Sequence, residues 1–239
     1  MGFYDVHSHI LPNFDDGAQT VEESLQLIDE LRKQKVTNLS LTPHFYTNEL
    51  SLEDFLEKRQ AAFEKFKPYI PADINVVLGC EVYVTDYMFN NSDLSALAYG
   101  NSRYILTEFP YGTKFGDRTM QKFYMLLQNY KLIPVMPHVE RYPNLMDSPS
   151  KIRELRELGV LIQTNISNYT KDASFLRKRK LLKYISKGMI DLLGSDTHSM
   201  THNPPNVFTE AMRTISQKCG TEQMGRMMNN ARDLFNKAL

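Results

Sequence analysis

Residues 3–9 read Phe-Tyr-Asp-Val-His-Ser-His, a short strand-like run that ends in two histidines. Side chains alternate along a strand, so His7 and His9 are predicted to project from the same face. Five of the six histidines in the chain follow an apolar run in this way, and Glu81 and Glu108 do the same. The segment therefore predicts a buried strand and, at its end, a site that gathers imidazole groups.

Outward from this segment, short apolar runs alternate with longer amphipathic stretches along the whole chain. The centres of the runs lie about 25–35 residues apart, which is the size of one strand–helix unit. The runs are apolar on both faces, as is typical of parallel strands that helices cover on both sides. The predicted strands are Phe3–Val6, Asn38–Leu41, Asn75–Leu78, Tyr104–Thr107, Ile133–Val135, Val160–Thr164 and Ile190–Leu193.

The amphipathic stretches carry helix start and stop signals. Thr20 and Glu23 form a capping box before a run of apolar residues at helical spacing, and Ser51 is a similar start signal. Gly159 and Gly188 stand where two helices are expected to stop. Further helices are predicted over Leu52–Phe66, Met120–Leu127, Ile152–Leu158 and Phe175–Ile185, and two more over Val207–Leu239 that separate near Gly220.

We expect a single domain over residues 1–239 with an α/β fold, a distorted (β/α)7 barrel one unit short of the common eight. An open doubly wound sheet is the alternative. In both folds the C-terminal ends of the strands build the active site, and polar groups follow every predicted strand. In strand order these groups are His7 with His9, His44, Glu81, Glu108, His138, Asn165, and Asp196 with His198. Imidazole and carboxylate ligands together bind divalent cations, so the pattern indicates a hydrolytic site with several metal ions.

Composition excludes several other classes of protein. The chain has 28 basic and 28 acidic residues, so it shows no overall electrostatic footprint for nucleic acid or an anionic membrane, although a local patch is compatible with this balance. No secretory signal and no apolar run of membrane-spanning length is present, and we expect no membrane insertion. Two distant cysteines, Cys80 and Cys219, indicate a reduced, cytoplasmic compartment.

The cysteines also exclude one kind of phosphatase. Neither Cys80 nor Cys219 lies in a phosphate-cradling loop with an arginine at the short spacing that a cysteine-dependent phosphatase needs. A Gly-x-Ser-x-Gly elbow and a phosphate-binding Gly-rich loop with lysine are absent as well. Metal-dependent chemistry remains the consistent interpretation.

Four acidic residues have competing interpretations. Asp5 is either a buried acid near the first histidines or a residue that orients them, and we favour the second role. Asp15 and Asp16 precede Gly17 and form either a turn or a ligand pair, and spacing does not decide between the two aspartates. Glu108 is either a ligand or the partner of an arginine.

Further along the chain, Arg141 and the basic run Arg177–Lys180 are each open to two interpretations, whereas His202 and Asn203 have one each. Arg141 suits a clamp for phosphate oxygens, and it equally suits an ion pair with Glu140 or another acid. His202 is predicted to be an exposed loop histidine, and Asn203, which precedes a proline, to be a helix N-cap. The basic run Arg177–Lys180 is interpreted as a solvated helix face, with an acidic partner as the alternative.

The polar motifs together resemble the polymerase-and-histidinol-phosphatase (PHP) superfamily. More narrowly, they are similar to the manganese-dependent protein tyrosine phosphatases of bacterial capsule and exopolysaccharide gene clusters. The similarity extends from the first predicted strand to the last. The matching segments are Asp5–Ile10, Asp15–Gly17 with Glu22–Ser24, Thr42–His44, Gly79–Glu81, Glu108–Phe109, Pro137–Tyr142 and Ser195–His198.

This resemblance implies a distorted seven-stranded barrel with three divalent metal ions. Manganese follows from the resemblance, whereas the ligand types alone suit iron or zinc equally. The resemblance also implies Asp16 rather than Asp15 as a ligand, Arg141 as the residue that binds the phosphate, and Arg141, Asp196 and His44 as catalytic residues. The implied ligand sets are His7, His9, Glu81 and Asp196 for one ion, Glu81, Glu108 and His138 for the second, and Asp16, His44 and His198 for the third.

One departure from the family pattern concerns the phosphate. An arginine precedes the Pro-Pro pair in the family, whereas this chain has Asn203 there. Either the phosphate clamp is weaker or a basic residue such as Arg118 or Lys114 substitutes.

The resulting hypothesis is hydrolysis of phosphate monoesters by a hydroxide that bridges two metal ions. The resemblance implies phosphotyrosine on a protein as substrate, in the control of capsular and exopolysaccharide biosynthesis, with a tyrosine kinase of a polysaccharide export system as partner. The alternatives are a small-molecule phosphatase of histidinol-phosphate type, an amidohydrolase-like enzyme that cleaves C–N bonds, and a catalytically silent, metal-stabilised binding module.

Overall fold

The strands of the computed structural model, which describes residues 2–239, follow the predicted alternation with helices. Every strand pair that these residues form is parallel, as predicted. The α/β class is therefore confirmed, and most strand bounds differ from the prediction by one or two residues. The strands are β1 (Phe3–Asp5), β2 (Val36–Leu41), β3 (His44–Tyr46), β4 (Asn75–Leu78), β5 (Glu81–Tyr83), β6 (Tyr104–Glu108), β7 (Ile133–Met136), β8 (Leu161–Asn165) and β9 (Leu192–Gly194).

Two of the predicted strands continue beyond a break that the sequence did not reveal. β2 leads through Pro43 into β3, and β4 leads through Cys80 into β5. His44 and Glu81, which were expected just after strands, instead each begin a second short strand. Proline has no backbone N–H to donate, which interrupts the ladder at Pro43, and pairing resumes where the Glu81 N–H donates to the Pro43 carbonyl at 3.0 Å.

The breaks divide the strands between two sheets. One sheet has the order β1-β2-β4 and the other the order β3-β5-β6-β7-β8-β9. The first and last strands meet beyond their ends, where Ser8 and Thr197 form a parallel bridge and the Asp196 N–H donates to the His7 carbonyl at 2.8 Å. The strands thus follow one another in chain order around an interrupted ring, without the reversal of order that a doubly wound sheet requires.

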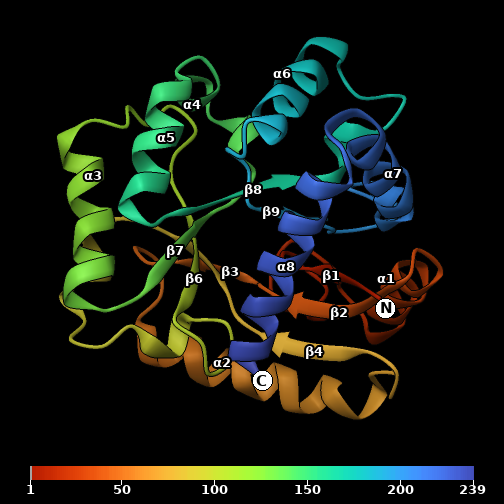
Figure 1. The fold of residues 1–239 in the computed structure, drawn as a ribbon. Coiled ribbons are helices and arrows are strands. Elements are labelled where there is room, and N and C mark those ends of the chain that lie inside the picture. The colour runs from red at the N-terminus through yellow and green to blue at the C-terminus, as the bar shows by residue number, and fades with distance from the viewer. Residues whose placement is uncertain (1) are drawn as a thin grey trace.

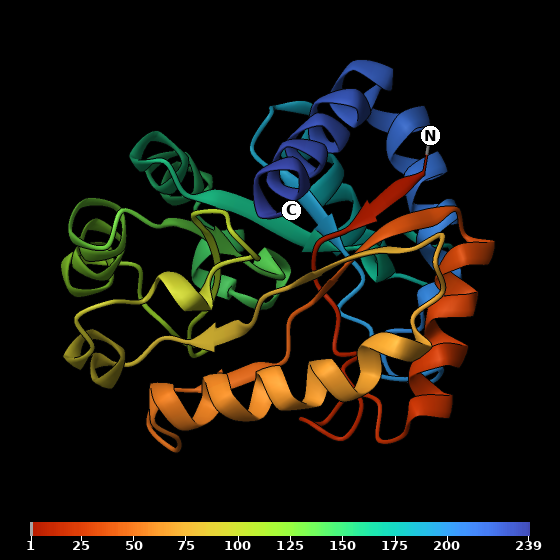
Figure 2. The same cartoon turned by 90° about the horizontal axis from the view of Figure 1, so that it is seen from below.

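Helices cover the outside of this ring (Figures 1 and 2). None of the helices in residues 2–239 combines the length and the apolar character needed to cross a membrane. The helices are α1 (Val21–Lys33), α2 (Leu52–Phe66), α3 (Asp117–Tyr124), α4 (Pro143–Met146), α5 (Pro149–Leu158), α6 (Phe175–Ser186), α7 (Phe208–Cys219) and α8 (Thr221–Ala238), besides several short 3-10 turns.

The capping signals explain where several helices begin and end. The Thr20 hydroxyl accepts a hydrogen bond from the Glu23 N–H at 3.1 Å, and Gly159 ends α5 in the left-handed region at φ 108°. The predicted helix α2 is confirmed residue for residue. The predicted helix over Met120–Leu127 is corrected, because α3 starts at Asp117 and changes into a π-helical turn at Met125.

The end of the ring where the strands begin is apolar. Tyr104 and Leu192, the first residues of β6 and β9, belong to one buried cluster with Leu234 and Phe235 of α8. Figure 1 shows α8 lying across the strands at this place. The C-terminal helix therefore closes one end of the ring with hydrophobic contacts, and the polar residues are left at the opposite end.

Candidate metal centre

The predicted polar groups gather at the C-terminal ends of the strands. His7 and His9 follow β1, Glu108 ends β6, His138 follows β7, and Asp196 follows β9. The side chains of His7, His9, Glu81, His138 and Asp196 are all buried. The residues form three overlapping sets, and within each set the ligand atoms lie within 4.8 Å of one another. The sets are His7, His9, Glu81 and Asp196; His9, Asp16, His44 and His198; and His44, Glu81 and Glu108.

The first set has the spacing of a metal polyhedron. His7 Nε2 lies 3.1 Å from His9 Nε2, and each of these nitrogens lies 3.2 Å from Glu81 Oε2. Asp196 Oδ1 lies 3.5 Å from both imidazole nitrogens. Four ligands arranged tetrahedrally at ~2.1 Å from an ion would be ~3.4 Å apart. These four residues therefore fit around one cation.

Glu81 connects this set to a second one. Its Oε1 lies 2.7 Å from His138 Nε2, whereas its Oε2 faces the first set. His138 Nε2 lies 3.6 Å from Glu108 Oε1, so the predicted trio of Glu81, Glu108 and His138 is brought together. The imidazole of His44 also approaches Glu81, with Nδ1 at 3.2 Å from Oε2. A carboxylate whose two oxygens face different groups of ligands is suited to bridging two ions.

The third set lies at the rim. Asp16 Oδ1 lies 3.6 Å from His44 Nε2 and 3.4 Å from His198 Nε2, and His9 lies beside them. The Asp16 side chain is 65% exposed, so this set is open to solvent, unlike the first. His202 is exposed, as predicted, and its ring centroid lies 4.6 Å from that of His198.

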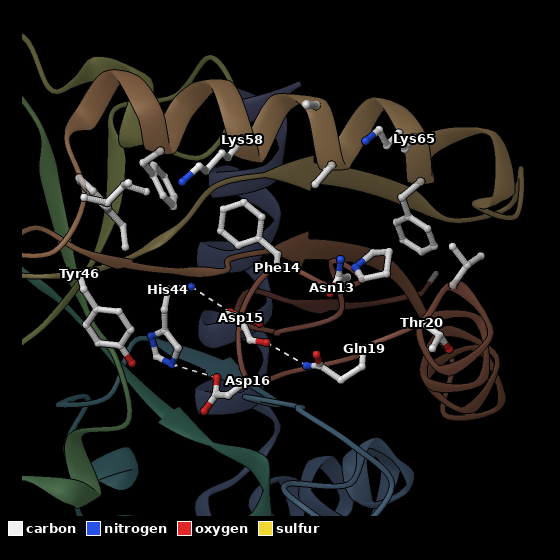
Figure 3. Close-up of a pocket in the computed structure, with 18 of the residues that line it drawn as sticks. Asn13, Phe14, Asp15, Asp16, Gln19, Thr20, His44, Tyr46, Lys58 and Lys65 are labelled. Carbon is white, nitrogen blue, oxygen red and sulfur yellow. Dashed lines mark hydrogen bonds and ion pairs between the residues drawn. The ribbon is translucent and has the colours of Figure 1, made fainter.

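The two neighbouring aspartates have different surroundings. Asp15 Oδ2 lies 2.7 Å from His9 Nδ1 and accepts a hydrogen bond from the His44 N–H at 2.9 Å, whereas Asp16 faces the histidines of the rim (Figure 3). Asp15 thus orients an imidazole from behind, an arrangement typical of metal sites. Asp5 has a different orienting role, since Oδ1 accepts from the Ser195 N–H at 2.8 Å and holds two chain segments together.

Gln163 on β8 is a polar residue that the sequence analysis missed. Its Oε1 accepts from the His138 N–H at 2.7 Å and lies 3.5 Å from His7 Nδ1. Its Nε2 donates to Asn165 Oδ1 at 2.9 Å. A glutamine in the middle of a predicted buried strand was the available signal, because a buried amide needs polar partners.

The Asp196 carboxylate has two distinct sides. Oδ2 accepts hydrogen bonds from Arg141, from Asn165 Nδ2 at 2.8 Å and from Asn203 Nδ2 at 2.9 Å. Oδ1 is buried, faces the imidazoles and has no hydrogen-bond partner among the described residues. His44 Nδ1 is also buried and forms no hydrogen bond with the described residues, although Glu81 Oε2 lies 3.2 Å away. Buried acceptor atoms without donors are costly, and a bound cation would satisfy them. The donor set and its unpartnered atoms therefore fit divalent metal ions.

One sequence-based interpretation is corrected at this carboxylate, and for Arg141 the predicted alternative of an ion pair with an acid is observed. Asn203 was expected to cap a helix, but α7 begins at Phe208 and the Asn203 side chain bonds Asp196 instead. Arg141 pairs with Asp196 and not with Glu140, whose carboxylate accepts from Thr164 Oγ1 at 2.8 Å. The guanidinium of Arg141 also donates to the Tyr111 hydroxyl at 3.3 Å and remains partly exposed at the rim.

The pKa values of ionisable groups in the cluster shift in different directions. Burial opposes ionisation of Glu81, but the charges of His7 and His138 hold the pKa of that carboxyl well below its usual range. Burial and the neighbouring charge of Glu81 raise the pKa of Glu108 to about 7. In the same way, burial and the charge of His9 lower the pKa of His198 to about 4. A cation bound between Glu81 and Glu108 would relieve the repulsion between these two carboxylates.

The backbone is strained at two of these positions. His138 has φ 32° and Asp196 has φ 54°, in the left-handed region that costs a residue other than glycine about 1–3 kcal/mol. Both strained residues carry polar groups of the cluster. The backbone conformation that positions these two residues therefore lowers the stability of the folded state.

The proposed substitutes for the missing arginine form no ion pair or side-chain hydrogen bond with this network among the described residues. Arg118 forms an ion pair with Asp86 and is exposed, and Lys114 is exposed as well. Aromatic rings line the rim instead, which the sequence did not predict. Tyr46 stacks on His44 with ring centroids 5.2 Å apart, and Tyr111 meets His138 edge-on at 6.0 Å.

The chain matches one family model and several named bacterial proteins over most of its length. The family model described as "Capsular polysaccharide synthesis, CpsB/CapC" matches residues 3–236. The chain is 28% identical to the tyrosine-protein phosphatase CpsB of Streptococcus agalactiae over 97% of both chains. It is 29% identical to CpsB of Streptococcus pneumoniae over 92% of both, and 28% identical to YwqE of Bacillus subtilis over 95% of this chain and 89% of YwqE.

Solved structures support the same fold. A crystal structure from a study of YwqE and CpsB, described as metal-dependent tyrosine phosphatases, superposes with a TM-score of 0.78 at 23% identity over 99% of this chain and 95% of that one. A phosphotriesterase homology protein from Escherichia coli, solved with phosphate in its active site, superposes with a TM-score of 0.60 at 14% identity over 98% of both chains.

Proposed function

Since the chain belongs to the CpsB/CapC family of capsular polysaccharide synthesis, we propose that it is a metal-dependent phosphatase that removes phosphate from tyrosine residues of proteins. The named relatives are tyrosine-protein phosphatases that match nearly the full length of the chain. The observation that carries the proposal is the bridging position of Glu81. Its Oε1 faces the imidazole of His138, and its Oε2 faces those of His7, His9 and His44. Paired metal sites of this kind are typical of phosphate hydrolysis.

We assign three ions to the cluster, with manganese as the metal. Each proposed ligand set combines carboxylate oxygens with imidazole nitrogens, which suit manganese, iron and zinc. The proposed ligands are His7, His9, Glu81 and Asp196 for the first ion, Glu81, Glu108 and His138 for the second, and Asp16, His44 and His198 for the third.

The bound ions would supply positive charge and a water of lowered pKa, which is the nucleophile in enzymes of this kind. The protein's own part is to bind and orient the phosphate. Arg141 is held between Asp196 and Tyr111, so its remaining N–H groups are positioned to contact phosphate oxygens. Asn203, in the place of the family's arginine, steadies Asp196 and does not itself bring a positive charge.

The leaving group explains why the cluster needs no dedicated acid. Tyrosine has a pKa of about 10, so tyrosinate departs with less protonation than a serine alkoxide would need. No residue of the site has to form a covalent phosphoenzyme, and Cys80 is buried away from solvent. The substrate protein is proposed to be a tyrosine kinase of a polysaccharide export system in the cytoplasm, on the basis of the family resemblance.

The test compares substrates before and after metal removal. The protein is stripped with a chelator, reloaded with manganese, iron or zinc, and counted for metal by mass spectrometry. We expect hydrolysis of phosphotyrosine peptides and p-nitrophenyl phosphate to disappear and return with the metal, with slow turnover of phosphoserine peptides. A protein that turns over histidinol phosphate but no phosphotyrosine peptide would be a small-molecule phosphatase. A loaded protein without turnover, whose metals only raise its melting temperature, would be a binding module.

A further inference from the structure

A cavity of about 780 Å³ opens beside the metal centre. Asp16, His44 and Tyr46 line one side of it, and helix α2 lines the opposite side (Figure 3). Pockets for small ligands range from about 300 to 1,000 Å³, so this space far exceeds what a single phosphate needs. The cavity thus extends the metal centre into a groove between α2 and the loop of residues 12–19.

The groove combines apolar and polar residues, and aromatic rings form its packed apolar part. Phe14 lies half-buried in the lining, with its ring edge-on to Phe55 at 5.7 Å, and Phe55 stacks on Phe45 at 4.3 Å. Ala61 and Ala62 of α2 leave room along the helix face because their side chains are small. This surface suits the apolar atoms of an extended peptide.

Two lysines give the groove a positive side. Lys58 and Lys65 line the cavity from α2, are exposed, and form no ion pair within the part of the chain that the structure describes. Glu49 is the one acid in the lining besides the Asp15–Asp16 pair of the metal centre. The two lysines are seven residues apart, about 10 Å along the helix axis, which matches about three residues of extended chain.

The same loop builds the groove and part of the metal centre. Phe14 precedes Asp15 and Asp16 directly. The loop is braced by its own hydrogen bonds, from the Asn13 N–H to the Ala18 carbonyl at 2.9 Å and from the Ala18 N–H to the His9 carbonyl at 3.0 Å. A peptide in the groove would therefore lie at a constant position relative to the cluster.

We propose that this groove binds the segment of the substrate protein next to the phosphotyrosine, as an extended chain with acidic side chains. The inference rests on the proposed function and specifies its substrate. Carboxylates about three residues apart would pair with Lys58 and Lys65, and small or apolar side chains between them would lie on Phe14 and the alanines. The lysines act here as specificity residues that do not touch the reacting phosphate.

The experiment reverses the charge of the groove. K58E/K65E is compared with the wild type and with K67E, a matched control whose lysine is exposed outside the cavity lining. The probes are two ten-residue phosphotyrosine peptides with a pair of glutamates either before or after the phosphotyrosine. Matched peptides carry glutamines or lysines at the same positions, and p-nitrophenyl phosphate reports on the metal centre alone.

We expect the double variant to raise KM for one of the two glutamate peptides about tenfold, as for the loss of two attractive and the gain of two repulsive surface charges. Its kcat and its turnover of p-nitrophenyl phosphate should stay within about twofold of the wild type, and the lysine peptide should become the better substrate. K67E should behave like the wild type. An unchanged KM for both glutamate peptides, or an equal rise for the glutamine peptides, would overturn the proposal.

Binding of the same peptides, labelled and followed by anisotropy, separates the two proposals. A metal-loaded protein that binds glutamate peptides through Lys58 and Lys65 but releases no phosphate from them would refute the proposed function and retain the groove. If phosphotyrosine peptides are hydrolysed equally well with and without glutamates, the proposed role of the groove is wrong and the proposed function stands.

Discussion

The two ends of the strand ring differ in chemistry although the same strands form both. Where the strands begin, Tyr104 and Leu192 lie in one buried, mainly apolar cluster with Leu234 and Phe235 of α8. Where they end, imidazoles and carboxylates crowd together, with unpartnered atoms and strained backbone. One end stabilises the fold, and the other uses part of that stability to position reactive groups. Substitutions at the two ends should therefore separate stability from activity.

The largest effect is expected for Glu81→Gln at the polar end. The amide has nearly the same shape as the carboxylate but lacks its negative charge, which faces His138 on one side and His7 and His9 on the other. We expect hydrolysis of p-nitrophenyl phosphate to fall by at least ~10³-fold, comparable to other losses of electrostatic stabilisation, and the metal count to fall. Far-ultraviolet circular dichroism should be unchanged. Glu64→Gln, at an exposed position of α2, is the control, and near-normal activity in Glu81→Gln would contradict the bridging role.

Leu234→Ala at the apolar end is expected to lower stability and to leave catalysis nearly unchanged. Leu234 is fully buried, and truncation of such a leucine costs about 2–5 kcal/mol in the free energy of unfolding. Urea denaturation should show this loss, whereas kcat of the folded, metal-loaded protein should change less than about twofold. A large loss of kcat without loss of stability would show that the two ends are not separate.

A smaller effect is expected for Arg141→Ala at the rim. The guanidinium is held by Asp196 and Tyr111 and lies partly exposed beside the metal centre. Losing a charged hydrogen-bond donor to phosphate should raise KM and lower kcat, and reduce kcat/KM by about 10–100-fold. Steady-state kinetics with p-nitrophenyl phosphate measure this. Arg118→Ala should leave the kinetics near those of the wild type, because Arg118 pairs with Asp86 away from the cluster.

No effect is expected from thiol alkylation. Burial raises the pKa of the Cys80 thiol to about 12, so hardly any reactive thiolate is present near neutral pH. Cys219 lies on α7 and takes no part in the metal centre. Treatment with iodoacetamide should leave the activity of the metal-loaded protein intact. Complete inactivation with all metals retained would point to a cysteine nucleophile.

The sequence predicted the strand–helix alternation better than it predicted the strand ends. Helix α2 was correct residue for residue, because its cap and its apolar spacing are local signals. The strands β3 and β5 were missed, because each has three residues after a break and is defined by its neighbours. The helix cap assigned to Asn203 was wrong for a related reason. A side chain that suits a cap also suits a distant carboxylate, and only the fold brought Asp196 within reach.

By itself the sequence determined which residues meet at one rim, since parallel strands that share a direction bring their C-terminal ends together. Only the tertiary structure decided how each group is used. It directed Asp15 to the back of His9 and Asp16 to the rim, brought Gln163 behind His138, and placed Phe14 opposite Lys58 across a groove. These relations depend on contacts between residues far apart in the chain or on the direction of single side chains, and neither is contained in periodicity or spacing.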